Sequence, residues 1–90
     1  MSHTVHAKKA LQARVRRLKG QMEAVDRALE DGRDCAEVLQ LLASIRGALN
    51  GLVGELMEGH LREHVLAAED EAARATAVEE ISAVLRTYMK

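Results

Sequence analysis

Apolar side chains recur along the chain at spacings of three and four residues, in three blocks separated by polar breaks; the spacings alternate in the first two blocks, and the third is weaker. This alternation keeps apolar side chains on one face of an α-helix, as in a heptad repeat. The pattern therefore predicts an all-α protomer of three helices, over residues 5–30, 35–66 and 71–88. The blocks comprise Leu11, Val15, Leu18, Met22, Val25 and Leu29; then Val38, Leu42, Ile45, Leu49, Leu52 and Leu56; then Ala75, Val78, Ile81, Leu85 and Tyr88.

Polar breaks separate the expected helices. In the first break, Gly32 suits the left-handed conformation in which many helices end. Asp34 stands at the N-cap position of the second helix, and Glu37 lies three residues later, as in a capping box. The second break covers residues 67–70, where the apolar pattern lapses.

The second helix is long for so small a chain. Thirty-two helical residues would span roughly 48 Å, and apolar side chains occupy more than one of its faces. The first helix covers one face, and we expect a second chain to cover another. Gly47, Ala48, Gly51 and Gly54 lie in its middle. Because a glycine within a helix costs about 1 kcal/mol relative to alanine, these small residues suggest that another helix approaches closely there.

Composition narrows the class of protein. Ninety residues form a single domain, 1–90, and a net charge of -1 excludes a uniformly basic, histone-like protein. The chain has one tyrosine and no phenylalanine or tryptophan, so its core is small and a homo-oligomer is expected. It has no long apolar run, no signal-peptide pattern and one cysteine, which together favour a cytoplasmic protein without a membrane span.

Histidine and cysteine residues offer candidate metal ligands. His60 and His64 lie one helical turn apart, a spacing at which two imidazoles can hold one cation. The same spacing also occurs in ordinary pairs on a solvated helix end. Cys35 is either a thiolate ligand or a small apolar residue at a helix start.

The distance between these candidates has a geometric consequence. In one unbroken helix, Cys35 and His60 stand roughly 37 Å apart, too far to share an ion. Two antiparallel copies of the helix would place Cys35 of one copy opposite His60 of the other. The copies would then cross between Gly47 and Ala48, where the small residues lie. The sequence thus predicts an antiparallel dimer with two equivalent sites.

One thiolate with several imidazoles suits Ni(II), Co(II), Zn(II) or Cu(II). His3 could add nitrogen donors and so favour octahedral Ni(II) or Co(II), with Zn(II) binding possible in vitro; alternatively, it belongs to a frayed terminus. We treat His6 as a bystander.

Basic residues concentrate in the first helix, whereas residues 51–90 carry eight acids against four bases. A concentrated basic face is typical of phosphate binding, although it can also be an ordinary solvated face. The absence of aromatic stacking residues favours double-stranded over single-stranded nucleic acid. No phosphate loop, catalytic triad or zinc-protease motif is present, so we do not expect an enzyme. The candidate DNA-binding residues are Lys8, Lys9, Arg14, Arg16, Arg17, Lys19 and Arg46.

Several stretches resemble one family over nearly the whole chain. They are residues 14–21 (RVRRLKGQ), Cys35 with residues 38–40 (VLQ), residues 45–52 (IRGALNGL), residues 60–64 (HLREH) and residues 85–90 (LRTYMK). In this set the chain resembles the CsoR/RcnR family of metal- and stress-sensing transcriptional repressors. The resemblance implies a three-helix protomer, an antiparallel dimer and a disc-shaped dimer of dimers. It also implies operator binding without a helix-turn-helix, weakened when an effector binds between protomers.

The ligand positions narrow the expected subgroup. The family's copper(I) sensors carry a second cysteine where this chain has His64, and its persulfide sensors also need a second cysteine. Its nickel/cobalt sensors use a set that corresponds here to His3, Cys35, His60 and His64. Its formaldehyde sensors use an N-terminal proline, where this chain has Ser2. The resemblance therefore implies a repressor that releases operator DNA on binding Ni(II) or Co(II), derepressing a metal efflux gene, with no further protein partner. The alternatives are a formaldehyde-responsive repressor and a cytosolic helical metal-binding protein without specific DNA binding.

Overall fold

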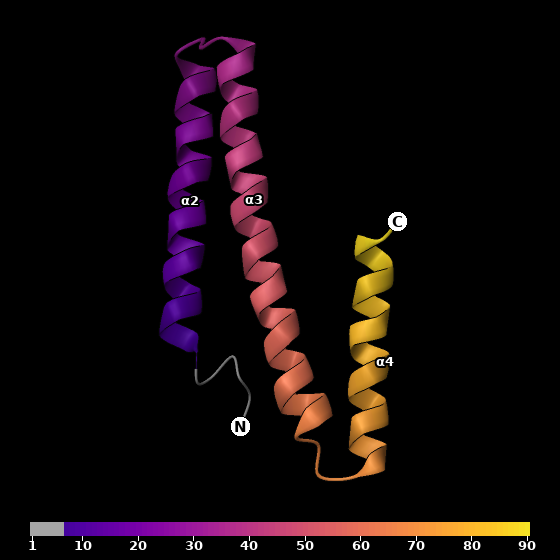
Figure 1. Ribbon diagram of the computed structural model, residues 1–90. Coiled ribbons are helices and arrows are strands. Elements are labelled where there is room, and N and C mark those ends of the chain that lie inside the picture. The colour runs from indigo at the N-terminus through magenta and orange to yellow at the C-terminus, as the bar shows by residue number, and fades with distance from the viewer. Residues whose placement is uncertain (1–6) are drawn as a thin grey trace. The chain divides into compact units, whose positions relative to one another are not determined.

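A computed structural model describes residues 7–90, so His3 and His6 lie outside the described residues. Helix α2 spans Lys8–Glu30, α3 spans Cys35–His60, the π-helix η1 spans Leu61–Leu66, and α4 spans Glu71–Tyr88 (Figure 1). Residues 7–90 contain no strand, which confirms the all-α fold. The chain divides into two compact parts, and each is described by itself. We call residues 8–53 the hairpin and residues 54–90 the C-terminal part.

The helix boundaries agree closely with those expected from the apolar pattern. The third helix occupies Glu71–Tyr88, as predicted, and the first ends at Glu30, as predicted. Its first residue in the structure is Lys8, and the expected start at residue 5 lies outside the described residues. The second helix is continuous from Cys35 through Leu66, but its last six residues are π-helical rather than α-helical.

The turn of the hairpin is a Schellman motif. Gly32 has φ of 65°, and its N–H donates to the carbonyl of Leu29 at 3.1 Å. The N–H of Arg33 donates to the carbonyl of Ala28 at 2.8 Å. These two bonds satisfy carbonyls that the end of α2 leaves without helical partners. The prediction that Gly32 adopts a left-handed conformation is confirmed.

An aspartate directly precedes each of the helices α3 and α4. The Asp34 carbonyl accepts from the N–H groups of Glu37 and Val38 at 3.0 and 3.2 Å. The Glu37 carboxylate accepts from Arg33 at 2.9 Å, so an exposed ion pair takes the place of the expected capping box. At α4 the Asp70 side chain accepts from the N–H of Ala73 at 2.8 Å, an ordinary N-cap.

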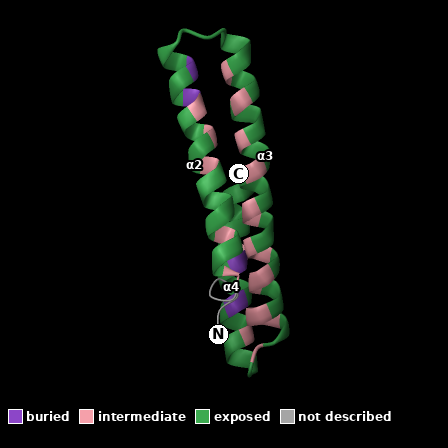
Figure 2. Cartoon of the chain, turned by 90° about the vertical axis from the view of Figure 1, so that its left-hand side faces the viewer, coloured by how far each residue is buried: buried purple, intermediate pink, exposed green. Residues whose placement is uncertain are grey.

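Few side chains of the described residues are buried, as Figure 2 shows. Val25 and Ala28 are buried on α2, Ala77 and Ile81 on α4, and no residue of α3 reaches that level. Many heptad positions of the hairpin are 41–63% exposed. We call five of them the apolar stripe: Val15, Met22 and Leu29 on α2, with Leu42 and Leu49 on α3. Within each helix these positions recur every seven residues, so each helix leaves exposed apolar side chains along one of its faces.

Candidate metal centre and nucleic-acid interface

The two candidate histidines of the C-terminal part lie side by side. His60 is the last residue of α3, and His64 lies in η1, the segment that ends at Leu66. Their ring centroids are 5.0 Å apart, with the planes tilted by 58°. Both side chains are half-buried. The sequence prediction that these imidazoles share one face of the helix is therefore correct in geometry.

The His60 ring is held by α4. Its Nε2 lies 3.0 Å from the carbonyl oxygen of Ala77, in a partly buried position. Because a carbonyl oxygen only accepts, Nε2 carries the proton and donates it in this bond. The lone pair of the ring is then on Nδ1. A histidine that binds a metal through one nitrogen commonly donates the other N–H to a carbonyl, so His60 is set for ligation through Nδ1.

A π-turn carries the second histidine. The N–H of Ala67 donates to the carbonyl of Arg62 at 3.1 Å, five residues earlier, which is the π pattern. Near the end of this turn, Nε of Arg74 on α4 donates to the carbonyl of Val65 at 3.0 Å. The other end of the Arg74 guanidinium donates to Glu71 at 2.6 Å. The turn that carries His64 is thus joined to α4 by a charged hydrogen-bond donor.

The remaining candidate ligands do not join the histidine pair within the described part of the chain. Cys35 is exposed and is the first residue of α3, the helix whose last residue is His60. Among residues 7–90, no three His, Cys, Asp or Glu side chains gather closely enough to hold a metal ion. The described residues therefore supply two imidazoles, which suit a borderline ion, and a complete site needs donors from elsewhere.

The candidate DNA-binding residues all lie in the hairpin and are all exposed. Arg14 and Arg17 line a hollow of about 210 Å³ between α2 and α3. Leu18 forms part of the α2 side of this hollow, while Gly47, Ala48 and Gly51 form its α3 side. The other candidates, which do not line it, are Lys8, Lys9, Arg16 and Lys19 on α2 and Arg46 on α3.

Gly51 makes room for one of these arginines. A Cβ atom at Gly51 would lie 3.3 Å from Nη1 of Arg14, closer than most such contacts. A Cβ at Gly47 would meet no atom within 4 Å among the described residues. The close approach expected at the small residues is therefore made within the chain by an arginine side chain at Gly51. At Gly47 the surface of the described hairpin is open.

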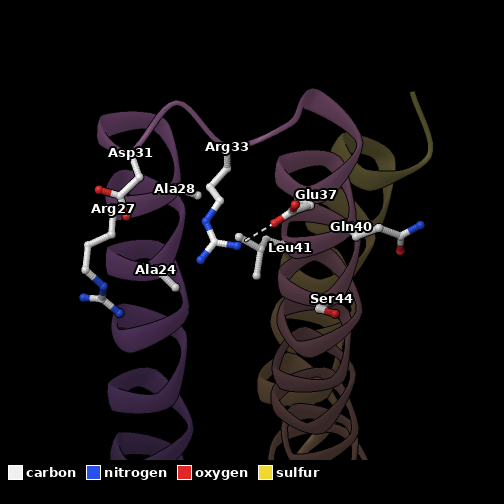
Figure 3. Close-up of a pocket in the computed structure, with 9 residues that line it drawn as sticks. All are labelled: Ala24, Arg27, Ala28, Asp31, Arg33, Glu37, Gln40, Leu41 and Ser44. Atoms are coloured by element: carbon white, nitrogen blue, oxygen red, sulfur yellow. Dashed lines mark hydrogen bonds and ion pairs between the residues drawn. The ribbon is translucent and has the colours of Figure 1, made fainter.

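A larger hollow, of about 580 Å³, lies near the turn of the hairpin (Figure 3). Ala24, Ala28 and Leu41 contribute apolar surface to it. Cationic and anionic side chains share its rim, where Arg33 pairs with Glu37 at 2.9 Å. Because charges of both signs face it, this hollow lacks the one-sided charge expected of a phosphate-binding surface.

Sequence reasoning missed the two contacts that fix the histidine pair. The acceptor for His60 is a backbone carbonyl at Ala77, and a backbone group gives no residue-type signal. Arg74 had a weak signal, since it is a base among the acids that begin the third helix.

Within residues 7–90, no helix is both long and apolar enough to cross a membrane.

Comparisons with known proteins agree on one family. The family model described as metal-sensitive transcriptional repressor matches residues 7–87. Over full length, the chain is 53% identical to an uncharacterised protein from the bioA 5′ region of Serratia marcescens, across 91 residues. It is 44% identical, again over the whole of both chains, to the transcriptional repressor RcnR of Citrobacter koseri.

One solved structure is similar throughout. It is a variant, with histidine in place of a glutamate, of the formaldehyde-responsive regulator FrmR from Salmonella enterica serovar Typhimurium. The match has a TM-score of 0.87 at 45% identity and covers 96% of this chain and 98% of that one.

Proposed function

Because this chain belongs to the family of metal-sensitive transcriptional repressors, we propose that it represses a metal efflux gene and responds to Ni(II) or Co(II). In this proposal the metal-free homo-oligomer, a dimer or a dimer of dimers, binds double-stranded operator DNA. Binding of Ni(II) or Co(II) lowers the affinity of the oligomer for operator DNA, and the DNA is released. Zn(II) also binds in vitro, but its binding releases operator DNA less effectively.

The arrangement of the histidine pair carries the proposal. His60 and His64 lie with ring centroids 5.0 Å apart, and the Ala77 carbonyl holds His60 with Nδ1 as the free lone pair. Two half-buried imidazoles, one already oriented by a backbone acceptor, are the kind of donors that Ni(II) and Co(II) accept. The full-length similarity to RcnR repressors supports the same interpretation.

A second protomer completes the site in this proposal. Helix α3 has 26 residues and is therefore roughly 39 Å long, with Cys35 first and His60 last. Cys35 of one protomer therefore joins His60 and His64 of an antiparallel partner. His3 supplies further nitrogen donors, although it lies outside the described residues. When bound, the ion supplies Lewis-acid bonds that tie nitrogen and sulfur donors of two protomers together.

The apolar stripe and the open surface at Gly47 support this pairing. The stripe needs an apolar partner, and a second copy of the same hairpin presents one. An antiparallel crossing between Gly47 and Ala48 would bring the partner helix to Gly47, where a Cβ would meet no described atom within 4 Å. The basic residues of α2 then line up across protomers as a phosphate-binding surface. They comprise Lys8, Lys9, Arg14, Arg16, Arg17 and Lys19, with Arg46 of α3 beside them.

In this proposal, coupling between metal binding and DNA release depends on the N-terminal segment. A ligand shifts an equilibrium only by its differential affinity for the two states. When His3 binds the ion, it pulls on the segment just before the basic residues at the start of α2. Ions that recruit His3 therefore change DNA affinity most. His3→Ala should leave much of the metal binding in place but impair release of DNA.

Fluorescence anisotropy on labelled DNA from the gene's own upstream region tests the proposal. Ni(II), Co(II), Zn(II), Cu(I) and formaldehyde are added separately and without oxygen. We expect release by Ni(II) or Co(II), and weaker release by either ion with His3→Ala. Release by none of the metals would contradict metal-induced release of DNA. Undiminished release with His3→Ala would contradict the role of His3 in coupling.

Similarity to the FrmR variant structure favours a second candidate, a formaldehyde-responsive repressor. Cys35 is exposed and would be the reactive thiol of such a sensor. This chain has Ser2 and no proline, which counts against that interpretation. In the same titration, release by formaldehyde alone would favour it. A helical metal-binding protein without specific DNA affinity would bind upstream and unrelated DNA equally.

A further inference from the structure

We propose that Arg74 is a positioning residue: it holds residues 61–66 in the π form and so sets the side from which His64 faces His60. This inference rests on the proposed function only in that the two imidazoles hold a metal ion. It assigns a role to a side chain of α4 that lies outside the candidate ligand set.

The form of this turn decides where His64 lies around the helix axis. At 3.6 residues per turn, four residues of α-helix carry the chain slightly past one full turn. When hydrogen bonds close between residues five apart, four residues fall short of a full turn. His64 therefore lies on opposite sides of the line through His60 in the two forms. In the π form the ring centroids are 5.0 Å apart, with a 58° tilt.

The contacts of Arg74 fix where the Val65 carbonyl points, at the end of the π segment. The last carbonyls of a helix lack helical partners and take other donors. The Val65 carbonyl receives Nε–H of Arg74 at 3.0 Å, and the N–H of Ala68 lies at 3.4 Å. The exposed Glu71 carboxylate accepts from the other end of the same guanidinium at 2.6 Å.

Arg74 and the acceptor for His60 share one face of α4. Residues three apart on a helix are neighbours, so Arg74 lies beside Ala77, whose carbonyl accepts from His60 at 3.0 Å. One face of α4 thus holds the first histidine directly and the second through its turn. Ala77 is only 4% exposed, so the face of α4 that carries the acceptor for His60 is packed against its surroundings.

Loss of Arg74 should therefore alter the metal site without removing a ligand. With Arg74→Ala the turn loses its charged donor and relaxes toward the α form, which rotates His64 relative to His60. Removal of such outer partners commonly lowers metal affinity by about 10–100-fold. The ligand-field absorption bands of bound Co(II) should change position as well, because they depend on the arrangement of donors.

The test is a double-mutant cycle read by Co(II) titration of the full chain without DNA. Wild type, Arg74→Ala, His64→Ala and the double variant are compared for Co(II) affinity and absorption. We expect Arg74→Ala to weaken Co(II) binding at least about tenfold when His64 is present, and by less than about twofold when His64 is absent. Arg86→Ala, an exposed arginine later in α4, is the matched control and should leave both readouts unchanged.

Two results would overturn the inference. One is an Arg74→Ala protein with the affinity and spectrum of wild type. The other is an equal loss of affinity with and without His64, which would mean that Arg74 supports the fold in general. Arg74→Gln, which keeps an N–H donor, is measured alongside and should restore part of the affinity, so a poorly folded alanine variant does not decide the result. If wild type itself bound no Co(II), the proposed function would fail, and that outcome is distinct from both.

Discussion

Different kinds of contact hold the helices together within the hairpin and within the C-terminal part. Between α2 and α3, only Val25 and Ala28 are buried, and the apolar stripe stays exposed. In the C-terminal part, directed hydrogen bonds join α4 to the end of the preceding helix, from His60 to Ala77 and from Arg74 to Val65. Apolar contact tolerates sliding, whereas a hydrogen bond specifies distance and direction.

This contrast matches what each part has to do in the proposed function. A pair of metal ligands needs fixed geometry, and the C-terminal part supplies it within one chain. A DNA-binding surface made of several protomers needs an interface, and the hairpin leaves an apolar face for one. In the proposed function, the chain is therefore preorganised at the histidines, and the hairpin needs a second protomer to cover its apolar stripe.

The largest effect is expected at the apolar stripe of the hairpin. Met22 is 51% exposed in the middle of the apolar stripe, and Met22→Glu would place a charge in the proposed interface. Burial of an unpaired charge costs several kcal/mol, so the oligomer should dissociate. Sedimentation velocity measures this directly. Gln12→Glu adds the same charge at an exposed position of α2 outside the stripe and should leave the assembly intact.

A smaller effect is expected on the basic surface of the hairpin. Arg17→Ala should weaken DNA binding to all sequences and lower the salt dependence by about one unit of slope for each phosphate that its guanidinium neutralises. The measurement is anisotropy on operator DNA at several salt concentrations. Arg33→Ala removes an equal charge from the turn, outside the basic residues of α2, and should leave the slope unchanged. An equal slope for Arg17→Ala and wild type would remove Arg17 from the interface.

The smallest effect is expected at the hollow beside Arg14. Gly51→Ala places a Cβ 3.3 Å from Nη1 of Arg14, so the guanidinium must shift by a few tenths of an ångström. Alanine should stabilise α3 by up to about 1 kcal/mol, while DNA affinity falls by about two- to fivefold. Thermal unfolding and anisotropy together measure both changes. Gly20→Ala meets nothing within 4 Å and should stabilise the protein without loss of DNA affinity.

The same contrast explains which features the sequence could predict. Apolar periodicity and a left-handed glycine predicted the three helices and the turn, because each is encoded by residue type at short range. The α4 boundaries, Glu71–Tyr88, and the conformation of Gly32 follow from such signals. The His60–His64 pairing was predictable for the same reason, since an i,i+4 spacing fixes neighbours on a helix.

Other features depend on contacts that residue type does not encode. The π form of residues 61–66 gives no signal in the apolar pattern, whose second block ends at Leu56. The acceptor for His60 is a backbone carbonyl on another helix. The neighbour of Gly51 is the Arg14 side chain of α2, and residue type does not say which side chain of another helix approaches a glycine. The ligand set beyond the histidine pair stays a prediction, with His3 outside the described residues.

The most direct test of the proposed function asks whether two protomers share one metal site. Cys35→Ala and the double variant His60→Ala/His64→Ala are prepared separately, and neither should give the thiolate-to-Co(II) absorption band of a full site. After equimolar mixing and subunit exchange, mixed dimers contain one site with every ligand, so about a quarter of the wild-type band should appear. No band after exchange, or a full band in either variant alone, would contradict the shared site.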